Sequence, residues 1–348
     1  MYILKIDSEK LKKFCTEILE KMGLPNKDAS LVSATLVFAD LRGVHSHGVA
    51  RLKSYIDRIK AGVICPITNI KILREDCSTV LIDGQNGFGQ VIGVKAMQIA
   101  VEKAAKTGIC FVGVKNSNHL GVLAYYAMQA TQKNMIGIIT TNAAPAVAPW
   151  GGTEALFGTN PIAIGIPKKD EPLVLDMAFT TVARGKIRLA KKKKEKIPLG
   201  WALDKKGRPT TDPDEALKGS LVSIGEFKGV NILMMIDILC GILTGSKANS
   251  KVKRVTDLSG PTGIGNNFLA IDITRFLDIN DFYTRVDELV YKVKNTQKLK
   301  GVEEIFLPGE PENRNYNLYK KEGIPLNKEI VKELENVAEE LCVKAKLI

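Results

Sequence analysis

Histidine is the scarcest residue that could serve catalysis in this chain, with three in 348 residues. Histidine is also the side chain whose unperturbed pKa lies closest to neutrality. Proton transfer near pH 7 therefore has few candidates: His45, His47 and His119. Because they fall in two separate segments without an adjoining Asp or Glu cluster, we expect no metal site.

Cysteine motifs and long apolar runs are also missing. The six cysteines form no Cys-x-x-Cys pair, and Cys15, Cys110 and Cys240 lie among apolar residues, which predicts buried side chains. The longest apolar stretch, residues 230–243, is too short to span a bilayer and predicts a buried helix. Residues 1–13 lack the apolar core of a signal peptide. We therefore expect a cytoplasmic protein with no membrane partner.

The charge is unbalanced, with 50 Lys and Arg against 38 Asp and Glu, a net charge of +12. Such an excess can attract nucleic acid or steer small anions toward a site. Part of it lies in residues 191–196, which contain no interleaved aromatic residue and match no nucleic-acid-binding motif. We interpret that run as a solvated loop and expect no nucleic-acid partner. A basic nucleic-acid-binding protein stays an alternative, one whose affinity would fall steeply with salt.

The pattern of apolar residues predicts a helical start followed by strands that alternate with helices. Helices are predicted at residues 8–22, with Ser8 as N-cap, then 28–42 and 52–61. Strands are predicted at 78–83, 109–114, 135–140, 162–166, 173–177 and 268–273. Further helices are predicted at 90–107, 120–132, 230–243, 278–295 and 327–344. This alternation predicts an α/β fold with a largely buried sheet.

The chain is long enough for two structural units. We expect a helical substrate and dimer region at residues 1–64, joined by residues 315–348, and an α/β cofactor-binding domain at residues 65–314.

The segment from Gly43 to Arg51 is the densest polar cluster of the chain. His45, Ser46, His47 and Arg51 lie within seven positions, and Gly43 and Gly48 let the backbone turn tightly. The planar guanidinium of arginine fits a carboxylate. The segment thus suits proton transfer to an anionic substrate, although polar loops between helices often only cap helix ends.

A glycine-rich segment at residues 79–93 resembles a dinucleotide-binding fingerprint but has the wrong spacing. Gly87 and Gly89 are followed by Gly93, one residue too far for Gly-x-Gly-x-x-Gly. No acidic strand end follows about twenty residues later. We interpret it as a plain strand–turn–helix junction rather than a Rossmann site.

Several segments together resemble one enzyme family over nearly the whole chain. They are 43–51, Asn116-Ser117-Asn118-His119, 149–152, 158–161, 176–186, 200–202, 211–213, 228–229 and 308–311. In this order they are similar to the type-2 malate/L-lactate/L-sulfolactate dehydrogenase family, and most of all to its archaeal sulfolactate branch, which serves coenzyme M biosynthesis.

The resemblance implies NAD, with NADP as the alternative, bound without a Rossmann fold by a mixed sheet flanked by helices. It also implies a homodimer whose active site lies between domains. The activity implied is that of an L-2-hydroxycarboxylate dehydrogenase, which reduces 2-oxo acids such as sulfopyruvate, oxaloacetate or 2-oxoglutarate.

Site roles follow from the resemblance residue by residue. His119 resembles the catalytic acid/base, and Ser46, His47 and Lys186 resemble a polar relay beside it. Arg51 resembles the carboxylate binder, and Arg184 or Lys186 is expected to bind a second anionic group, while His45 is expected to pack or cap. The implied cofactor contacts are Asn116, Ser117, Asn118, His119, Leu120, Thr141, Asp176, Met177, Ala178, Lys228, Gly309, Glu310, Pro311 and Arg314.

Two features bear on these assignments. Glu226 and Asn231 stand where the family commonly has glycines around Lys228, so this chain departs from the family pattern beside that cofactor contact. An imino-acid or ureidoglycolate reductase on the same scaffold is the main alternative. Members of the imino-acid branch resemble this chain but carry a carboxylate at the position of Lys186, so this lysine favours the hydroxy-acid branch.

Overall fold

A computed structural model describes residues 3–347 and centres on a seven-stranded mixed sheet. The strand order is β2-β3-β4-β11-β5-β6-β7, and within this order only the β3–β4 pair is parallel. The strands are β2 (Lys71–Glu75), β3 (Thr79–Asp83), β4 (Ile109–Ser117), β5 (Met135–Thr141), β6 (Ile162–Ile166), β7 (Leu173–Met177) and β11 (Ile264–Asp272). The predicted α/β fold with a mixed sheet is confirmed.

One face of the sheet is covered by α4 (Gly89–Thr107) and α5 (Ala124–Thr131). Side chains at alternate strand positions point into this layer, as the two-residue period of a strand requires. Val112, Ile139, Ala163 and Phe268 are fully buried there. Helix α4 joins the parallel strands β3 and β4, so the glycine-rich segment is the strand–turn–helix junction that the sequence predicts.

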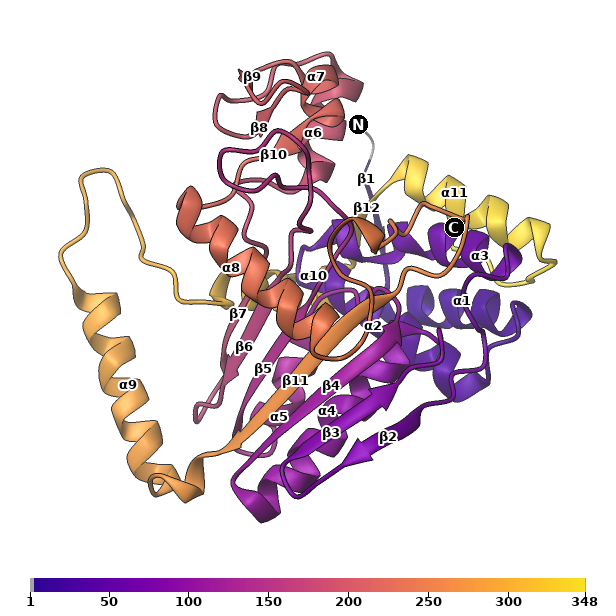
Figure 1. Cartoon of the computed structure of the whole chain (residues 1–348). Helices are drawn as coiled ribbons and strands as arrows, with labels where there is room; N and C mark the ends of the chain where they lie inside the picture. Colours follow the sequence, from indigo (N-terminus) through magenta and orange to yellow (C-terminus); the bar gives the residue numbers. More distant parts are fainter. Residues whose placement is uncertain (1–2, 348) are drawn as a thin grey trace.

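The opposite face is covered only in part, by α8 (Phe227–Asp237) and the π-helical turn η3 (Ile238–Ile242) (Figure 1). Gly265 on β11 lies against η3 so closely that a Cβ atom there would be 1.7 Å from the Cys240 carbonyl oxygen. The strand side chains on this face, such as Ile138 and Ile164, are partly buried, so the sheet is buried more completely on the α4–α5 side. Cys240, like Cys15 and Cys110, is buried as predicted.

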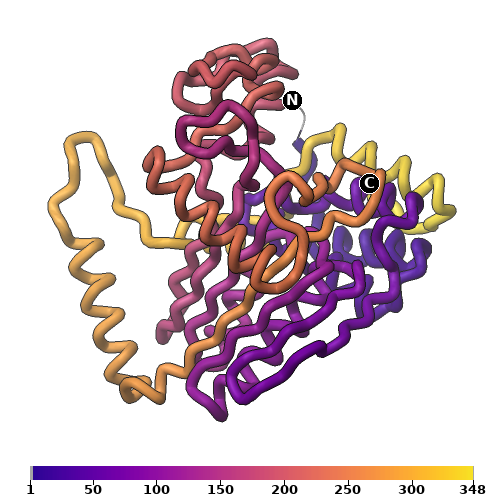
Figure 2. Tube along the Cα trace, viewed as in Figure 1, coloured from indigo at the N-terminus to yellow at the C-terminus, as the bar shows by residue number. Residues whose placement is uncertain are grey.

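The two ends of the chain share a hydrophobic core (Figure 2). The elements that build it are α1 (Ser8–Lys21), α2 (Asn26–Leu41), α3 (Leu52–Lys60), α10 (Glu310–Glu322), α11 (Lys328–Glu340) and the antiparallel pair β1 (Ile3–Ile6) and β12 (Ile324–Asn327). Phe14, Leu36 and Leu334 are buried in it. The domain boundaries expected from the sequence remain a prediction.

The N-cap of α1 is Asp7 rather than Ser8. The Asp7 carboxylate accepts a hydrogen bond of 2.8 Å from the Lys10 backbone N–H. A carboxylate in this position also interacts favourably with the positive end of the helix dipole, whereas Ser8 is already buried in the first turn.

A small lobe stands above the sheet in Figure 1. It contains α6 (Arg184–Lys193), α7 (Pro213–Lys218) and three two-residue strands, β8 (Ala202–Leu203), β9 (Pro209–Thr210) and β10 (Ser220–Leu221). The predicted loop at residues 191–196 is wrong in its first half, because Lys191, Lys192 and Lys193 form the last turn of α6. Lysine is a good helix former, and cations are favourable at a helix C-terminus.

Several other elements differ from the prediction. No residue pattern predicted β1, β2, β12 or α10. The three strands are short or exposed, and α10 opens with Gly309-Glu310-Pro311. Proline at the start of a helix is well tolerated because the first N–H groups have no intrahelical acceptor. Helix α5 begins four residues later than expected, and β4 and β11 are longer than expected. Helix α9 (Ile279–Asn295) forms as predicted and lies apart from the main body of the protein (Figures 1 and 2).

Candidate active site

Asp40, at the end of α2, holds the loop that carries the paired histidines. Its side chain is 1% exposed, with Oδ1 2.8 Å from His45 Nδ1 and Oδ2 accepting a 2.7 Å hydrogen bond from the Val49 N–H. A Cβ atom at Gly48 would lie 2.2 Å from this carboxylate, so glycine is required there. His45 therefore has a structural role in the loop.

The loop brings His47 against His119, which follows the end of β4. The two rings are stacked, with centroids 5.4 Å apart and an angle of 22° between their planes. Burial and the nearby Arg51 charge lower the pKa of His47 to about 4. Burial, His47 and Arg51 lower the pKa of His119 well below 6.5. Both imidazoles are therefore neutral at pH 7.

Tyr55 and Gln90 complete the surroundings of His119, and neither was predicted from the sequence as a site residue. Tyr55 Oη lies 2.8 Å from His119 Nδ1, and Gln90 Nε2 donates a 2.9 Å hydrogen bond to Tyr55 Oη. Because Oη accepts from Gln90, its own proton is free to be donated to Nδ1. That arrangement leaves the Nε2 atom of His119 to carry the ring proton. Burial raises the pKa of Tyr55 to about 12, so the phenol stays protonated.

Ser46 and Arg51 bond to the same loop. Ser46 Oγ lies 2.9 Å from His47 Nδ1, and Arg51 Nε donates a 2.7 Å hydrogen bond to the Ser46 carbonyl oxygen. Within residues 3–347 no carboxylate forms an ion pair with Arg51. The structure thus brings together Ser46, His47, Arg51 and His119, four residues that the sequence selects from positions up to 73 apart.

The segment from Asn116 to Leu120 is held mainly by structural contacts. Asn118 is 2% exposed, and its side chain donates to the Gly87 carbonyl oxygen at 2.9 Å and accepts from Thr262 Oγ1 at 3.0 Å. A Cβ atom at Gly89 would lie 2.4 Å from the Asn118 carbonyl oxygen. The glycines after β3 therefore allow α4 to approach the backbone that carries His119. Ser117 and Leu120 are buried, and Asn116 is partly exposed.

Thr141, Asp176, Met177 and Ala178 lie at the ends of β5 and β7. Asn266 Nδ2 donates a 2.6 Å hydrogen bond to Thr141 Oγ1, while Asn266 Oδ1 is buried with no hydrogen-bond partner within residues 3–347. Asp176 Oδ2 accepts a 2.8 Å hydrogen bond from the Ala124 N–H in the first turn of α5. Desolvation raises the pKa of Asp176 to about 6.

Within residues 3–347, three expected site residues on α6 and α8 form no hydrogen bond or ion pair with His47 or His119. Arg184 donates to the Leu217 carbonyl oxygen, and Lys186 is exposed on α6. Lys228 lies in the first turn of α8, after Gly225 with φ of 60° and Glu226 with φ of 54°. Glu226 thus adopts a backbone conformation that favours glycine, the residue that the family commonly has at this position. The roles of these three residues stay predictions.

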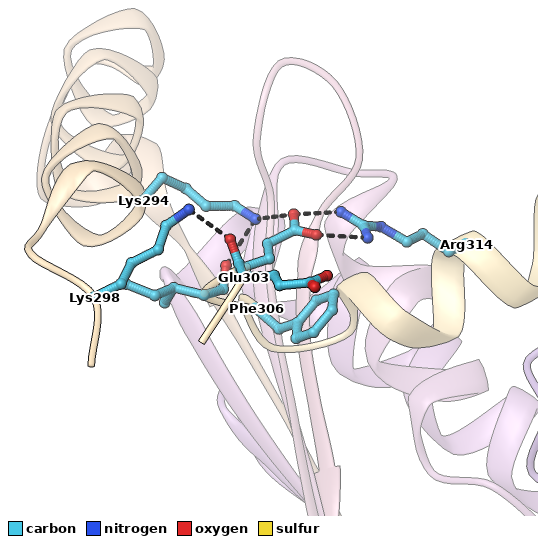
Figure 3. A pocket seen from close by; sticks show the side chains of 7 residues that line it. Lys294, Lys298, Glu303, Phe306 and Arg314 are labelled. Carbon is cyan, nitrogen blue, oxygen red and sulfur yellow. Dashed lines mark hydrogen bonds and ion pairs between the residues drawn. The ribbon is translucent and has the colours of Figure 1, made fainter. Parts of the chain in front are cut away.

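The remaining expected contacts, Gly309, Glu310, Pro311 and Arg314, open α10 beside the loop that follows α9 (Figure 3). Arg314 forms an ion pair with Glu304, and Lys294 with both Glu304 and Glu310. The Arg314 guanidinium lies 5.0 Å from the centroid of the Phe306 ring. Lys294, Glu304 and Arg314 therefore surround the Phe306 ring and line the pocket that Figure 3 shows.

Comparison with known proteins adds the family. The profile described as malate/L-lactate dehydrogenase matches residues 6–335. A malate dehydrogenase of Pyrococcus abyssi is 42% identical over 98% of this chain and 96% of its own length. A malate/(S)-sulfolactate dehydrogenase of Methanothermus fervidus is 42% identical over 97% of this chain and 98% of its own.

Solved structures agree with that match. The sulfolactate dehydrogenase of Methanocaldococcus jannaschii superimposes with a TM-score of 0.92 at 40% identity, covering 98% of both chains. A more distant relative, the ureidoglycolate dehydrogenase (NAD(+)) of Escherichia coli K12, is 32% identical over 93% of both chains. Within residues 3–347, no helix is both long and apolar enough to cross a membrane. By profile, sequence identity and fold, this chain belongs to the malate/L-lactate dehydrogenase family of oxidoreductases.

Proposed function

We propose that this protein is a cytoplasmic L-2-hydroxycarboxylate dehydrogenase that reduces doubly anionic 2-oxo acids, such as sulfopyruvate, oxaloacetate or 2-oxoglutarate. A role in coenzyme M biosynthesis would follow if sulfopyruvate is the substrate. The observation that carries the proposal is the neutral, stacked pair of His47 and His119 beside Arg51. This arrangement places a proton donor next to a cation that can bind a carboxylate.

The family requires a nicotinamide cofactor, and the residues at the strand ends fit one. The buried Asn266 Oδ1 atom lacks a donor beside Thr141, and a carboxamide N–H has the chemistry to supply it. When bound, the cofactor supplies a hydride to the keto carbon of the substrate. Asn116, Thr141 and Asp176 are the residues we assign to hold it.

NAD is the cofactor that the charges around α10 favour. NADP carries an extra phosphate on the ribose, which needs an uncompensated cation. Arg314 and Lys294 are already paired with the carboxylates of Glu304 and Glu310. Gly309 to Arg314 are expected cofactor contacts, and if the adenosine end of the cofactor lies here, the site suits a free ribose hydroxyl.

His119 is the proton donor in this proposal. As the keto group is reduced, negative charge develops on its oxygen, and a positioned donor contributes about 10² to 10⁴ in rate. Tyr55 occupies the Nδ1 side of the ring, so Nε2 is the atom that can donate. Arg51 uses its Nε atom to bind the Ser46 carbonyl oxygen, which fixes the guanidinium and leaves its two terminal nitrogens for the substrate carboxylate.

The test is nicotinamide oxidation with NADH and NADPH against sulfopyruvate, oxaloacetate, 2-oxoglutarate and pyruvate. We expect turnover of the doubly anionic acids. His119→Asn should abolish it, and Arg51→Ala should mainly raise KM. Arg208→Ala is a matched control, because Arg208 pairs with Asp204 in a turn of the small lobe. Full activity of His119→Asn would remove the proposed donor and leave His47 as the candidate.

The second candidate function is reduction of an imino acid or oxidation of ureidoglycolate, which the named relatives at lower identity make reasonable. Lys186 favours the hydroxy-acid reaction, since it stands where the imino-acid branch is expected to have a carboxylate. If no 2-oxo acid is turned over but a cyclic imine or ureidoglycolate is, this second function replaces the first.

A further inference from the structure

Helix α10 extends from the expected cofactor contacts to the loop that carries His47 and Arg51. Its first residues are among those contacts, and the helix packs on α2, which ends where that loop begins (Figure 1). With 13 residues at a rise of about 1.5 Å each, α10 spans about 20 Å. One rigid element therefore lies against both the expected cofactor contacts and the loop.

The start of α10 is fixed to β7, the edge strand that carries Asp176. The Val174 N–H donates a 3.1 Å hydrogen bond to the Pro308 carbonyl oxygen. Gly309 has a φ of 84°, and a Cβ atom there would lie 2.9 Å from the Val174 carbonyl oxygen. Glycine is the residue that fits both the close approach and the positive φ. The helix therefore begins at a fixed place beside β7.

Two asparagines of α10 contact the start of the loop at residues 43–51, which we call the histidine loop. Asn313 Oδ1 accepts a hydrogen bond from Arg42 Nη1, and Arg42 is the residue that follows α2. Asn315 Nδ2 lies 3.5 Å from the Arg42 carbonyl oxygen, to which it donates. A Cβ atom at Gly43 would lie 2.6 Å from the same Asn315 nitrogen. The histidine loop therefore starts in direct contact with α10.

Arg42 is a buried cation that is not paired with a carboxylate. It is 4% exposed, and within residues 3–347 its guanidinium forms no ion pair. The guanidinium lies 5.5 Å from the centroid of the Phe38 ring. Burial lowers the pKa of Arg42, and the charges of Glu312 and Asp176 partly oppose this. Because a buried donor is costly to leave without an acceptor, the Asn313 oxygen determines where this guanidinium is held.

We propose that Arg42 and Asn313 are positioning residues that couple α10 to the histidine loop, so that cofactor bound at the start of α10 favours the substrate-binding position of Arg51. The inference rests on the proposed function, which assigns the cofactor to Gly309–Arg314 and the substrate carboxylate to Arg51. Asp40 holds the opposite side of the loop through the Val49 N–H, so a shift at Arg42 is passed along the loop backbone. Such coupling is reciprocal, and each ligand tightens the other by the same factor, typically about 5-fold to 150-fold.

The first test compares amide variants on this one helix. Asn313→Ala should raise the KM for oxaloacetate by at least about fivefold, while the Kd for NADH without substrate stays within about twofold of the wild type. Asn313→Asp keeps an acceptor oxygen for Arg42 and should restore the wild-type KM. Asn317→Ala is the matched control, because it removes an exposed amide of α10 that bonds Glu171. Circular dichroism checks that each variant folds.

The second test is the factor by which saturating L-malate lowers the Kd for NADH, measured by nicotinamide fluorescence. We expect at least about fivefold for the wild type and Asn317→Ala, and a factor about threefold smaller for Asn313→Ala. An equal factor in the two variants, or an Asn313→Asp variant no better than Asn313→Ala, would overturn the coupling.

The two proposals fail in different ways. A wild type that neither binds NADH nor reduces any 2-oxo acid would refute the proposed function. A wild type that binds NADH and reduces oxaloacetate, but whose affinity for NADH does not respond to L-malate, would refute the coupling alone.

Discussion

Removing the Tyr55 hydroxyl gives the most direct test of how His119 is controlled. In Tyr55→Phe, His119 Nδ1 loses its 2.8 Å contact and Gln90 Nε2 loses its acceptor, and both atoms are in the interior. A buried polar group left without a partner costs about 1–3 kcal/mol. We therefore expect stability to fall by about that amount.

Activity should fall as well, because nothing then fixes the proton of His119 on Nε2. If the same energy is lost from the transition state, kcat/KM decreases by about 5-fold to 150-fold. Most of the decrease should be in kcat, since Tyr55 faces the side of the ring away from the donating atom.

The assay is nicotinamide oxidation at saturating and limiting 2-oxo acid, together with urea unfolding of the same samples. Tyr283→Phe is the matched control, because it removes an exposed tyrosine hydroxyl that bonds only Asn134. If Tyr55→Phe keeps wild-type kcat while losing stability, Tyr55 supports the fold alone and the proposed control of His119 is wrong.

Two further outcomes are expected. Asp40→Ala leaves the Val49 N–H without its buried acceptor, so the free energy of unfolding in urea should fall by about 1–3 kcal/mol. The kcat/KM measured by turnover should fall with it. Unchanged turnover would show that the loop does not need the Asp40 carboxylate. His47 and His119 have depressed pKa values in the folded state, so the unfolded chain takes up protons first, and stability should decline as the pH falls from about 6.5 toward 4. Urea midpoints across this range should show a shallower decline in a His47→Asn, His119→Asn double variant, and an equal slope would contradict the assignment.

Residue patterns along the chain determined much of the architecture. The short apolar runs of β5 and β6 and the apolar stripe of α1 depend on neighbours within one element, and these elements lie where the sequence predicts them. The short strands β8, β9 and β10 have no such pattern, because two residues give no period. Lys191 to Lys193 were misassigned because their helical state depends on Ile187 and Ala190, which anchor α6 in the small lobe.

The site divides in the same way. The sequence alone identifies four site residues: Ser46, His47, Arg51 and His119. Their residue types and the family resemblance are enough to select them. Tyr55 and Gln90 cannot be identified in this way. A tyrosine on an apolar helix face and a glutamine after three glycines indicate no site role until the fold brings α3, α4 and the end of β4 together.

Tertiary structure also decided which apolar residues are left uncovered. Ile138 and Ile139 read alike in the sequence, yet one is fully buried under α5 and the other faces outward. Alternation specifies that the two side chains point to opposite faces. Whether anything covers a face depends on where segments distant in sequence are placed, and packing at long range is the physical information that a local pattern does not contain.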